Sequence, residues 1–393
     1  MAERRRQVDC RRQLGCRRQV GCRRGWAAYA ERVKQRIVGV DIARGLAVIG
    51  MFVAHLGDSG PDGEHSPSWF VVADGRPSAM FAILAGLSIA LFTGGRTAPR
   101  GPALTHGWLR IATRAGVVLV IGLLLELLQT PVAVILPSYA VTFLLVAPFI
   151  ALRPWVVAVL AVVAAVLGPL LLALAVSPTA DGLSPAERLV GPEDNYVLDL
   201  LLTGYYPALV WIAYMLLGLC VGRLDLRSPH VQALLALTGA GLALVGYGGG
   251  SYLQRTVVAD SALTAQLLRS DPHSDATLEL LGNAGVTLAV LGVLLALTTL
   301  PPVARVARVL LQPLAATGAM ALTAYSLHIV AIAVLGEEVV WYPESNAVLA
   351  WFVVVTLVVC TVWMRLVGRG PLEWVMRRLT VGSYRPPVAT SHA

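Results

Sequence analysis

Long apolar runs, separated by short polar links, dominate the chain from residue 37 onward. A run of about 20 apolar residues can cross a bilayer as a helix. The pattern predicts an all-α fold, a polytopic transmembrane helical bundle. Because the links are short, we expect one transmembrane domain over 37–367, followed by a cytosolic C-terminal tail over 368–393. Ten spans are predicted, at about 37–57, 69–93, 108–129, 132–152, 154–176, 200–222, 231–251, 278–300, 313–335 and 347–367.

The charges in the links predict how this bundle is oriented. Cytosolic links of membrane proteins carry an excess of Lys and Arg. The links here alternate between basic and acidic through all ten spans, which favours an even number of spans. We therefore expect a multi-pass protein of the plasma membrane with both termini in the cytosol. The basic links contain Arg96, Arg100, Arg153, Arg223, Arg227, Arg305 and Arg308, and the acidic ones contain Asp58, Asp62, Glu64, Asp181, Glu187, Glu193, Asp194, Glu337, Glu338 and Glu344.

Two features are expected on the outer side of the bundle. The longest polar links, at 58–68, 177–199 and 252–277, are predicted to cover a pocket that opens outward. In the sixth span, the YYP sequence at Tyr205 to Pro207 predicts a kink, because proline interrupts helical hydrogen bonding.

Composition changes this picture only at the N-terminus. The net charge of the chain is +8, but residues 1–36 alone hold 12 Lys+Arg against 3 Asp+Glu. The body carries no aromatic-interleaved basic patch, so no nucleic-acid partner is expected. The tail repeats RRQVDC, RRQLGC and RRQVGC, and it reads as a basic, low-complexity cytosolic segment or as a polybasic membrane anchor. Its C-x5-C-x5-C spacing matches no zinc pattern, so we expect neither a metal nor a disulfide.

Charged residues inside the first span are the first sign of chemistry. A charge at membrane depth costs about 2.5–3.5 kcal/mol, so such residues normally face a protein interior or a wet cavity. Arg44 and His55 are eleven residues apart and share one helical face, with Asp41 close to that face. Asp41 and Arg44 either pair with each other or bind a substrate. His55 lacks a local partner, which favours a cavity-facing role.

The link between the first two spans and the start of the second add further candidates. His65 lies in GEHSPSW, and an imidazole there can act as a general base or a nucleophile. Asp74 and Arg76 precede Pro77 at the outer end of the second span. Asp74 either orients a histidine or holds a substrate amine, or it caps the helix near Pro77.

The later spans contribute fewer polar residues. Arg110 and Arg114 are an i, i+4 pair that either binds donor phosphates or extends to lipid headgroups. In the ninth span, Thr317 and His328 are expected on one face, with Tyr325 one turn from His328. These side chains either line a cavity or form hydrogen bonds within the core. No Gly-rich phosphate loop, HExxH or GxSxG motif occurs, which argues against ATPase, zinc-hydrolase and serine-hydrolase functions.

At these residues the sequence resembles a known family. VDIARGLAVIGMFVAH, EHSPSW and ADGRPSAMFAILAGLS look like the start of the catalytic domain of heparan-alpha-glucosaminide N-acetyltransferase and its bacterial relatives. The stretches LLTGYYPALVWIAYMLLGLCVGRLDL, LQPLAATGAMALTAYSLHI and GPLEWVMRRLT resemble the YeiB-like bacterial branch. The resemblance covers about residues 37–380.

The resemblance implies an activity and a set of roles. Such enzymes move an acyl group, acetyl above all, from cytosolic acyl-CoA across the membrane to an acceptor amine or hydroxyl. It implies acyl-CoA as co-substrate, no metal, and His65 of the H-x-x-W loop as base or acyl carrier. His55 stands where the heparan enzyme has an Asn, which leaves acceptor activation open. Arg44, Arg110 and Arg114 would then meet donor phosphates, with Asp74 orienting the histidine.

Three functions compete at this point. The first is acyl transfer to an envelope sugar or lipid-linked acceptor, with membrane lipid as surroundings and a homodimer left open. The second is transport or export of a small polar solute, which predicts matched broken helices in the two halves of the chain. The sequence shows no matched pair of breaks. The third, a purely structural membrane protein, leaves the costly buried charges unexplained.

Overall fold

The computed structural model describes residues 36–57, 68–178, 184–190, 195–301, 303–341 and 345–381. The chain divides into a unit of residues 1–38 and a unit of residues 39–393. The RRQ repeats and His65 lie outside the described residues.

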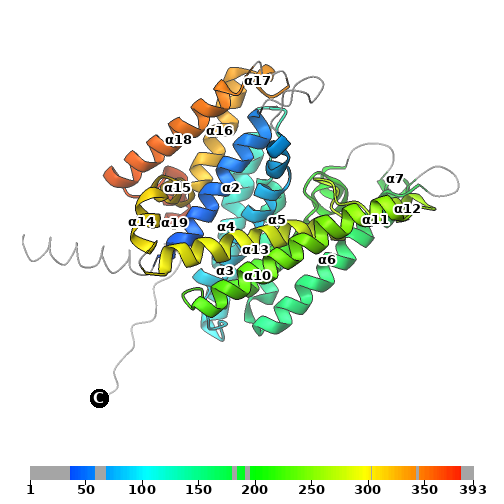
Figure 1. The fold of residues 1–393 in the computed structure, drawn as a ribbon, viewed down its shortest axis with the longest axis horizontal. Helices are drawn as coiled ribbons and strands as arrows, with labels where there is room; N and C mark the ends of the chain where they lie inside the picture. The colour runs from blue at the N-terminus through cyan, green and yellow to red at the C-terminus, as the bar shows by residue number, and fades with distance from the viewer. Residues whose placement is uncertain are drawn as a thin grey trace, which may run out of the picture. The chain divides into compact units, whose positions relative to one another are not determined.

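Every regular element in these ranges is helical, so the predicted all-α membrane bundle is confirmed (Figure 1). The principal helices are α2 (Val38–Leu56), α3 (Arg76–Phe92), α4 (Pro102–Glu126), α5 (Leu136–Val146), α6 (Pro154–Val176), α9 (Ala208–Val221), α10 (Pro229–Ala243), α13 (Thr277–Thr299), α15 (Gln312–Ala319), α16 (Ala321–Leu335), α18 (Ala347–Leu366) and α19 (Pro371–Val381). The shorter ones are η1 (Ser68–Ala73), η2 (Ala147–Ala151), α7 (Pro185–Val190), α8 (Tyr196–Leu198), η3 (Asp199–Thr203), η4 (Leu244–Gly249), α11 (Gly250–Thr256), α12 (Ala262–Leu267), α14 (Val303–Leu310) and α17 (Glu338–Trp341).

Each predicted span overlaps with at least one helix. Among the described residues, six helices are long and apolar enough to cross a membrane, and there are up to eight if two bent pairs count as one span each. The second and fourth predicted spans appear as the shorter apolar helices Arg76–Phe92 and Leu136–Ala151. The total of ten crossings and their direction therefore stay predictions.

Two of the predicted spans are broken rather than straight. Tyr196–Thr203 and α9 meet at 50°, on either side of the YYP sequence, which confirms the predicted kink. The expectation of one continuous helix over 313–335 is wrong, because α15 and α16 meet at 82°. Thr317 and His328 therefore do not share a helical face.

A side chain from the far end of the chain caps the second break. Met320, between α15 and α16, has non-helical dihedrals of φ −119° and ψ 27°. The Glu373 carboxylate then accepts hydrogen bonds from the backbone N–H of Thr323 (3.0 Å) and from its hydroxyl (2.6 Å). The first N–H groups of a helix need such partners, so Glu373 stabilises the start of α16.

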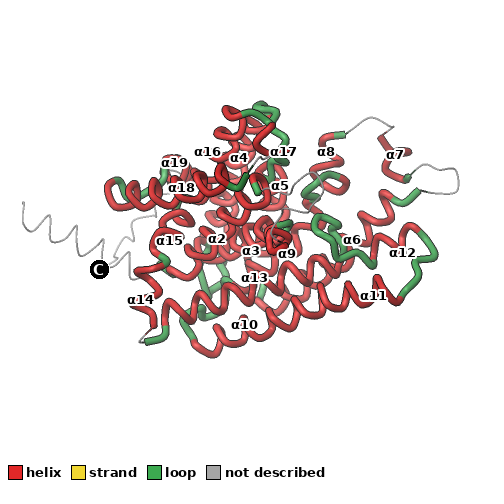
Figure 2. The backbone as a smooth tube through the Cα atoms, turned by 45° about the horizontal axis from the view of Figure 1, so that its top comes forward, coloured by secondary structure: helices red, strands yellow, loops and turns green. Residues whose placement is uncertain are grey.

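Close backbone contacts place α2, which carries the candidate residues of the first span. Gly318 of α15 lies so near α2 that a Cβ there would overlap the carbonyl oxygen of Asp41. Gly45 of α2 meets the backbone of Leu314 in the same way. Elsewhere α10 runs beside α13, and α9 packs between α3 and α6 (Figure 2). The two glycine contacts hold α2 closely against α15.

Candidate active site

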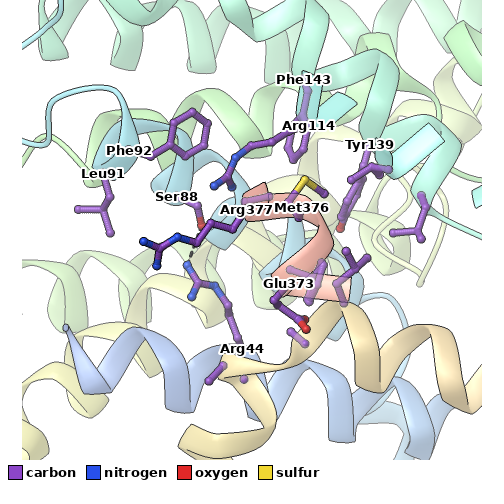
Figure 3. A pocket seen from close by; sticks show the side chains of 18 residues that line it. Arg44, Ser88, Leu91, Phe92, Arg114, Tyr139, Phe143, Glu373, Met376 and Arg377 are labelled. Atoms are coloured by element: carbon purple, nitrogen blue, oxygen red, sulfur yellow. Dashed lines mark hydrogen bonds between the residues drawn. The ribbon is translucent and has the colours of Figure 1, made fainter. Parts of the chain in front are cut away.

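The polar residues of α2 belong to two separate pockets. His55 lines a cavity of about 530 Å³, here called the histidine pocket, whose wall also includes Asp74, Ser78, Tyr205 and His273. Arg44 lines a second cavity of about 500 Å³, here called the arginine pocket. The wall of the second cavity also holds Phe81, Ser88, Phe92, Arg114, Tyr139, Phe143, Glu373, Met376 and Arg377 (Figure 3).

His55 is paired with His328, which lies far from it along the chain. Its Nδ1 lies 3.0 Å from Nε2 of the buried His328, and the two rings stack with centroids 5.3 Å apart. His328 Nδ1 lies 2.5 Å from the backbone carbonyl of Tyr325, which can only accept, so this nitrogen must donate. If both rings are neutral, His328 Nε2 then accepts a hydrogen bond from His55 Nδ1. The Nε2 lone pair of His55 is thereby left available to take a proton.

Asp74 and Arg76 point in different directions. Asp74 lines the histidine pocket, and burial raises the pKa of its carboxyl, with Arg76 opposing that rise. The Arg76 guanidinium instead lies over the ring of Tyr247, 4.4 Å from the centroid. Gly75 between them has a φ of +69°, a conformation that favours glycine. Asp74 therefore lines the pocket, whereas Arg76 packs on Tyr247.

A further histidine enters the pocket from the link before α13. His273 packs on Tyr205, with ring centroids 4.3 Å apart, and its Nδ1 is buried without a partner among the described residues. Burial lowers the pKa of His273 to about 4. Its φ of +58° is uncommon for a non-glycine residue and often marks a functional position. The sequence placed this link over the pocket but did not single out His273.

Glu279, at the start of α13, holds that link in place. Its carboxylate accepts hydrogen bonds from the N–H groups of His273 and Asp275, both at 2.8 Å, and from the Ser274 hydroxyl at 3.1 Å. It also accepts from Asn283 at 3.1 Å. A buried carboxylate with four donors is well satisfied, so the histidine pocket has a firm wall on this side.

Asp275 ties the same link to α9. Its carboxyl accepts a hydrogen bond from Trp211 Nε1 at 2.8 Å, and burial raises the pKa of Asp275 well above its usual value. Asn283 extends the network, donating to Tyr214 and accepting from Tyr247. None of these residues was predicted from the sequence.

Asp41 does not line the arginine pocket but pairs with Arg44, which does. Arg44 donates to the buried carboxylate of Asp41 at 3.0 Å and to the Ser88 hydroxyl at 2.7 Å. The alternative that Asp41 and Arg44 pair with each other is thus the one observed. Arg44 still lines the pocket, with its guanidinium fixed in position (Figure 3).

Arg110 and Arg114, the arginine pair noted in the sequence, line two different cavities. The Arg114 guanidinium lies 4.1 Å from the ring centroid of Phe92, lines the arginine pocket and keeps its Nε buried without a hydrogen-bond partner among the described residues. Arg110 donates to the carbonyl of Phe92 at 2.7 Å and lines a neighbouring cavity with Arg96 and Arg100. Both guanidinium groups lie against the ring of Phe92, which lines both cavities.

The two pockets adjoin at one hydrogen bond. Tyr139 lines the arginine pocket, and its hydroxyl donates to the backbone carbonyl of Ser78, which lines the histidine pocket, at 2.7 Å. Tyr325 is buried near this layer, where its hydroxyl accepts from the N–H of Ile135 at 3.3 Å. Tyr325 lines neither of the two pockets. A thin layer containing Tyr139 therefore stands between the arginines and the histidines.

Within the described residues, no three His, Cys, Asp or Glu side chains come together in a way that could hold a metal ion. The histidine pocket offers imidazole and carboxyl groups for proton transfer, and the arginine pocket offers guanidinium groups for an anion.

Two protein families match the chain. The family described as heparan-alpha-glucosaminide N-acetyltransferase, catalytic, matches residues 36–248, and a protein family of unknown function, DUF418, matches residues 241–383. A search of curated proteins finds no significant match. The first match spans both α2 and the Tyr139 layer and covers more than half of the sequence. The chain therefore belongs to the heparan-alpha-glucosaminide N-acetyltransferase catalytic family, as an all-α membrane protein.

Proposed function

We propose that the protein is an integral membrane acyltransferase. It moves an acyl group, in the first place acetyl, from cytosolic acyl-CoA to an amine or hydroxyl of an extracytoplasmic envelope sugar or lipid-linked acceptor. The observation that carries this proposal is the adjacency of the two pockets at the Tyr139–Ser78 hydrogen bond. An anion-binding cavity backs onto a proton-accepting cavity inside one bundle, and acyl transfer across a membrane needs both.

On the donor side, the arginine pocket suits acyl-CoA. The CoA phosphates are too highly charged to enter lipid, so they must stay at the cytosolic end. Arg44 and Arg114 can bind them, while the apolar wall formed by Phe81 and Phe143 can accept the uncharged pantetheine arm. The thioester would then point toward Tyr139 and the histidine pocket.

On the acceptor side, a histidine removes the acceptor proton. The nitrogen or oxygen of the acceptor attacks the thioester carbonyl carbon, the C–S bond breaks, and CoA leaves as a thiolate that takes up a proton. His55, through Nε2, is one candidate base. His65 is the other, as base or as transient acyl carrier, by resemblance to the family's H-x-x-W loop. Asp74 lies in the same pocket as His55 and can hold an acceptor amine or orient an imidazole.

The proposal is tested with the purified full-length protein, radiolabelled acetyl-CoA and a panel of amino sugars. We expect CoA release that is lost in His65→Ala and reduced in His55→Ala. His230→Ala serves as the control, because His230 is exposed at the start of α10 and lines none of the pockets described above. Label retained on the wild type would favour a covalent acyl-histidine over direct transfer. Absence of CoA release by the wild type with every acceptor would contradict acetyl transfer.

One observation favours a second candidate, a transporter or exporter of a small polar solute. The bends of 50° before α9 and 82° before α16 give the bundle two broken helices, a device that transporters use at their binding sites. The sequence had indicated only the first of them. A wild-type protein that binds no acyl-CoA, yet moves a solute into proteoliposomes, would favour this candidate over the enzyme.

A further inference from the structure

The C-terminal helix α19 forms one wall of the arginine pocket, although hydropathy assigned its residues to a cytosolic tail. Glu373, Met376 and Arg377 of α19 line the cavity, and α19 packs against α4 and α16. We propose that Arg377 binds a phosphate of the acyl-CoA donor, so that α19 is part of the donor site. This inference rests on the proposed acyltransferase function.

No ion pair among the described residues accounts for the position of Arg377. Among the described residues, no carboxylate lies within ion-pair distance of Arg377, and its side chain is exposed to the cavity and solvent. Glu373, one turn earlier on the same helix, is already engaged by the backbone N–H and the hydroxyl of Thr323. The guanidinium of Arg377 is therefore available to a ligand.

The neighbouring arginines make this part of the pocket electropositive. Arg44, Arg114 and Arg377 come from three different helices, and their guanidinium groups gather around Ser88 (Figure 3). Asp41 pairs with Arg44, the Glu373 carboxylate is engaged by Thr323, and no described carboxylate lies within ion-pair distance of Arg114. Like charges gathered at one cavity repel each other, and a bound anion relieves that repulsion.

The apolar part of the pocket lining indicates that the bound anion carries an apolar arm. Besides the arginines, the wall includes the apolar side chains of Phe81, Leu136, Phe143 and Met376, and also Tyr139, whose hydroxyl donates to the carbonyl of Ser78 at the histidine pocket. A phosphorylated molecule with a long uncharged arm fits this combination of groups. Acyl-CoA is such a molecule, with its phosphates at one end and its thioester at the other.

The next residue on α19 supplies a matched control. Arg378 has the same charge and the same helix, but its guanidinium lies over the ring of Trp374, 5.1 Å from the centroid, and it does not line the pocket. Replacing Arg377 or Arg378 by Gln removes one positive charge from α19 in either case. A difference between the two variants thus reports on the pocket and not on overall charge.

The experiment compares coenzyme A with pantetheine, which lacks the phosphates, as ligands of the full-length protein in nanodiscs of zwitterionic lipid. For Arg377→Gln we expect about tenfold weaker binding of coenzyme A, as for the loss of one charge-assisted hydrogen bond, and unchanged binding of pantetheine. Arg378→Gln should bind both as the wild type does. In turnover assays, Arg377→Gln should raise the KM for acetyl-CoA more than it lowers kcat.

The same phosphate chemistry is present in an anionic phospholipid headgroup. If coenzyme A binds Arg377→Gln as tightly as the wild type, while this variant alone loses co-purifying phosphatidylglycerol, Arg377 contacts lipid and the inference is overturned. Equal weakening of coenzyme A and pantetheine would also overturn it, because it would indicate a distorted pocket. A wild type that binds no coenzyme A at all would instead refute the proposed function.

Discussion

The replacement Glu279→Gln tests whether one buried carboxylate holds the wall of the histidine pocket. Glu279 is 4% exposed, and each of its oxygens accepts two hydrogen bonds. Oε1 accepts from the N–H of His273 and from Asn283, and Oε2 accepts from the N–H of Asp275 and from the Ser274 hydroxyl. Glutamine keeps the shape but turns one acceptor into a donor, which then faces a backbone N–H.

The size of the effect follows from that single mismatch. The Ser274 hydroxyl can rotate to accept from the new amide, whereas a backbone N–H cannot change its role. Losing one hydrogen bond to a charged group and leaving one buried donor unsatisfied costs about 2–4 kcal/mol. The link at 272–276 should open more easily by this amount, which is about 30- to 1000-fold in its opening equilibrium.

Hydrogen exchange measured by mass spectrometry can detect this change in peptides that cover residues 268–280. We expect faster exchange there in Glu279→Gln and unchanged exchange in α18, which serves as an internal reference. Glu337→Gln is the control variant, because Glu337 is exposed and removal of its charge should alter nothing in this link. If the 268–280 peptides of Glu279→Gln exchange as slowly as those of the wild type, the carboxylate does not hold the link and the reasoning fails.

Two further predictions concern packing and pH. Gly318→Ala should destabilise the protein by about 1–3 kcal/mol, because the added Cβ would overlap the backbone of Asp41. Gly116→Ala is the control, because no atom lies within 4 Å of the added group, and it should leave the stability unchanged. Thermal unfolding in detergent compares the two variants. The pKa of His273, about 4 when folded and 6.5 when unfolded, makes its contribution complete above about pH 6.5, and up to about 3 kcal/mol of it is lost as the pH falls toward 4. His273→Asn, which tolerates the positive φ, should therefore flatten the fall in Tm over this interval, and an identical fall in both proteins would contradict the assignment.

Much of the fold follows from the sequence because membrane spans depend on local hydropathy. The kink before α9 was also predictable, since Pro207 removes a backbone donor within the sixth span. The sharper break at Met320 was not, because neither Gly nor Pro stands at that position. Its cap, Glu373, lies 50 residues away from Thr323, beyond the range of any local pattern.

The site was predictable only where polarity is costly. Arg44 and His55 stand out because they interrupt an apolar run, and both line pockets. The pairing of His55 with His328 depends on how two distant helices pack, which no spacing rule reports. His273 and Arg377 escaped notice for the opposite reason. Each lies in a polar stretch, where a charge or an imidazole is unremarkable until the fold places it at a cavity.

The helix α16 joins the two pockets mechanically as well as by position. Its first turn is held by Glu373 of α19, which lines the arginine pocket, and the hydrogen bonds from Thr323 are 3.0 and 2.6 Å long. His328, five residues further along α16, holds His55 of the histidine pocket at 3.0 Å. A helix transmits a displacement of its first turn over so short a distance because its backbone hydrogen bonds resist bending. Any movement of α19 that carries Glu373 with it must therefore either shift the His328–His55 pair or break the cap of α16. Glu373 thus ties α19, a helix beyond the last predicted span, to the first turn of α16.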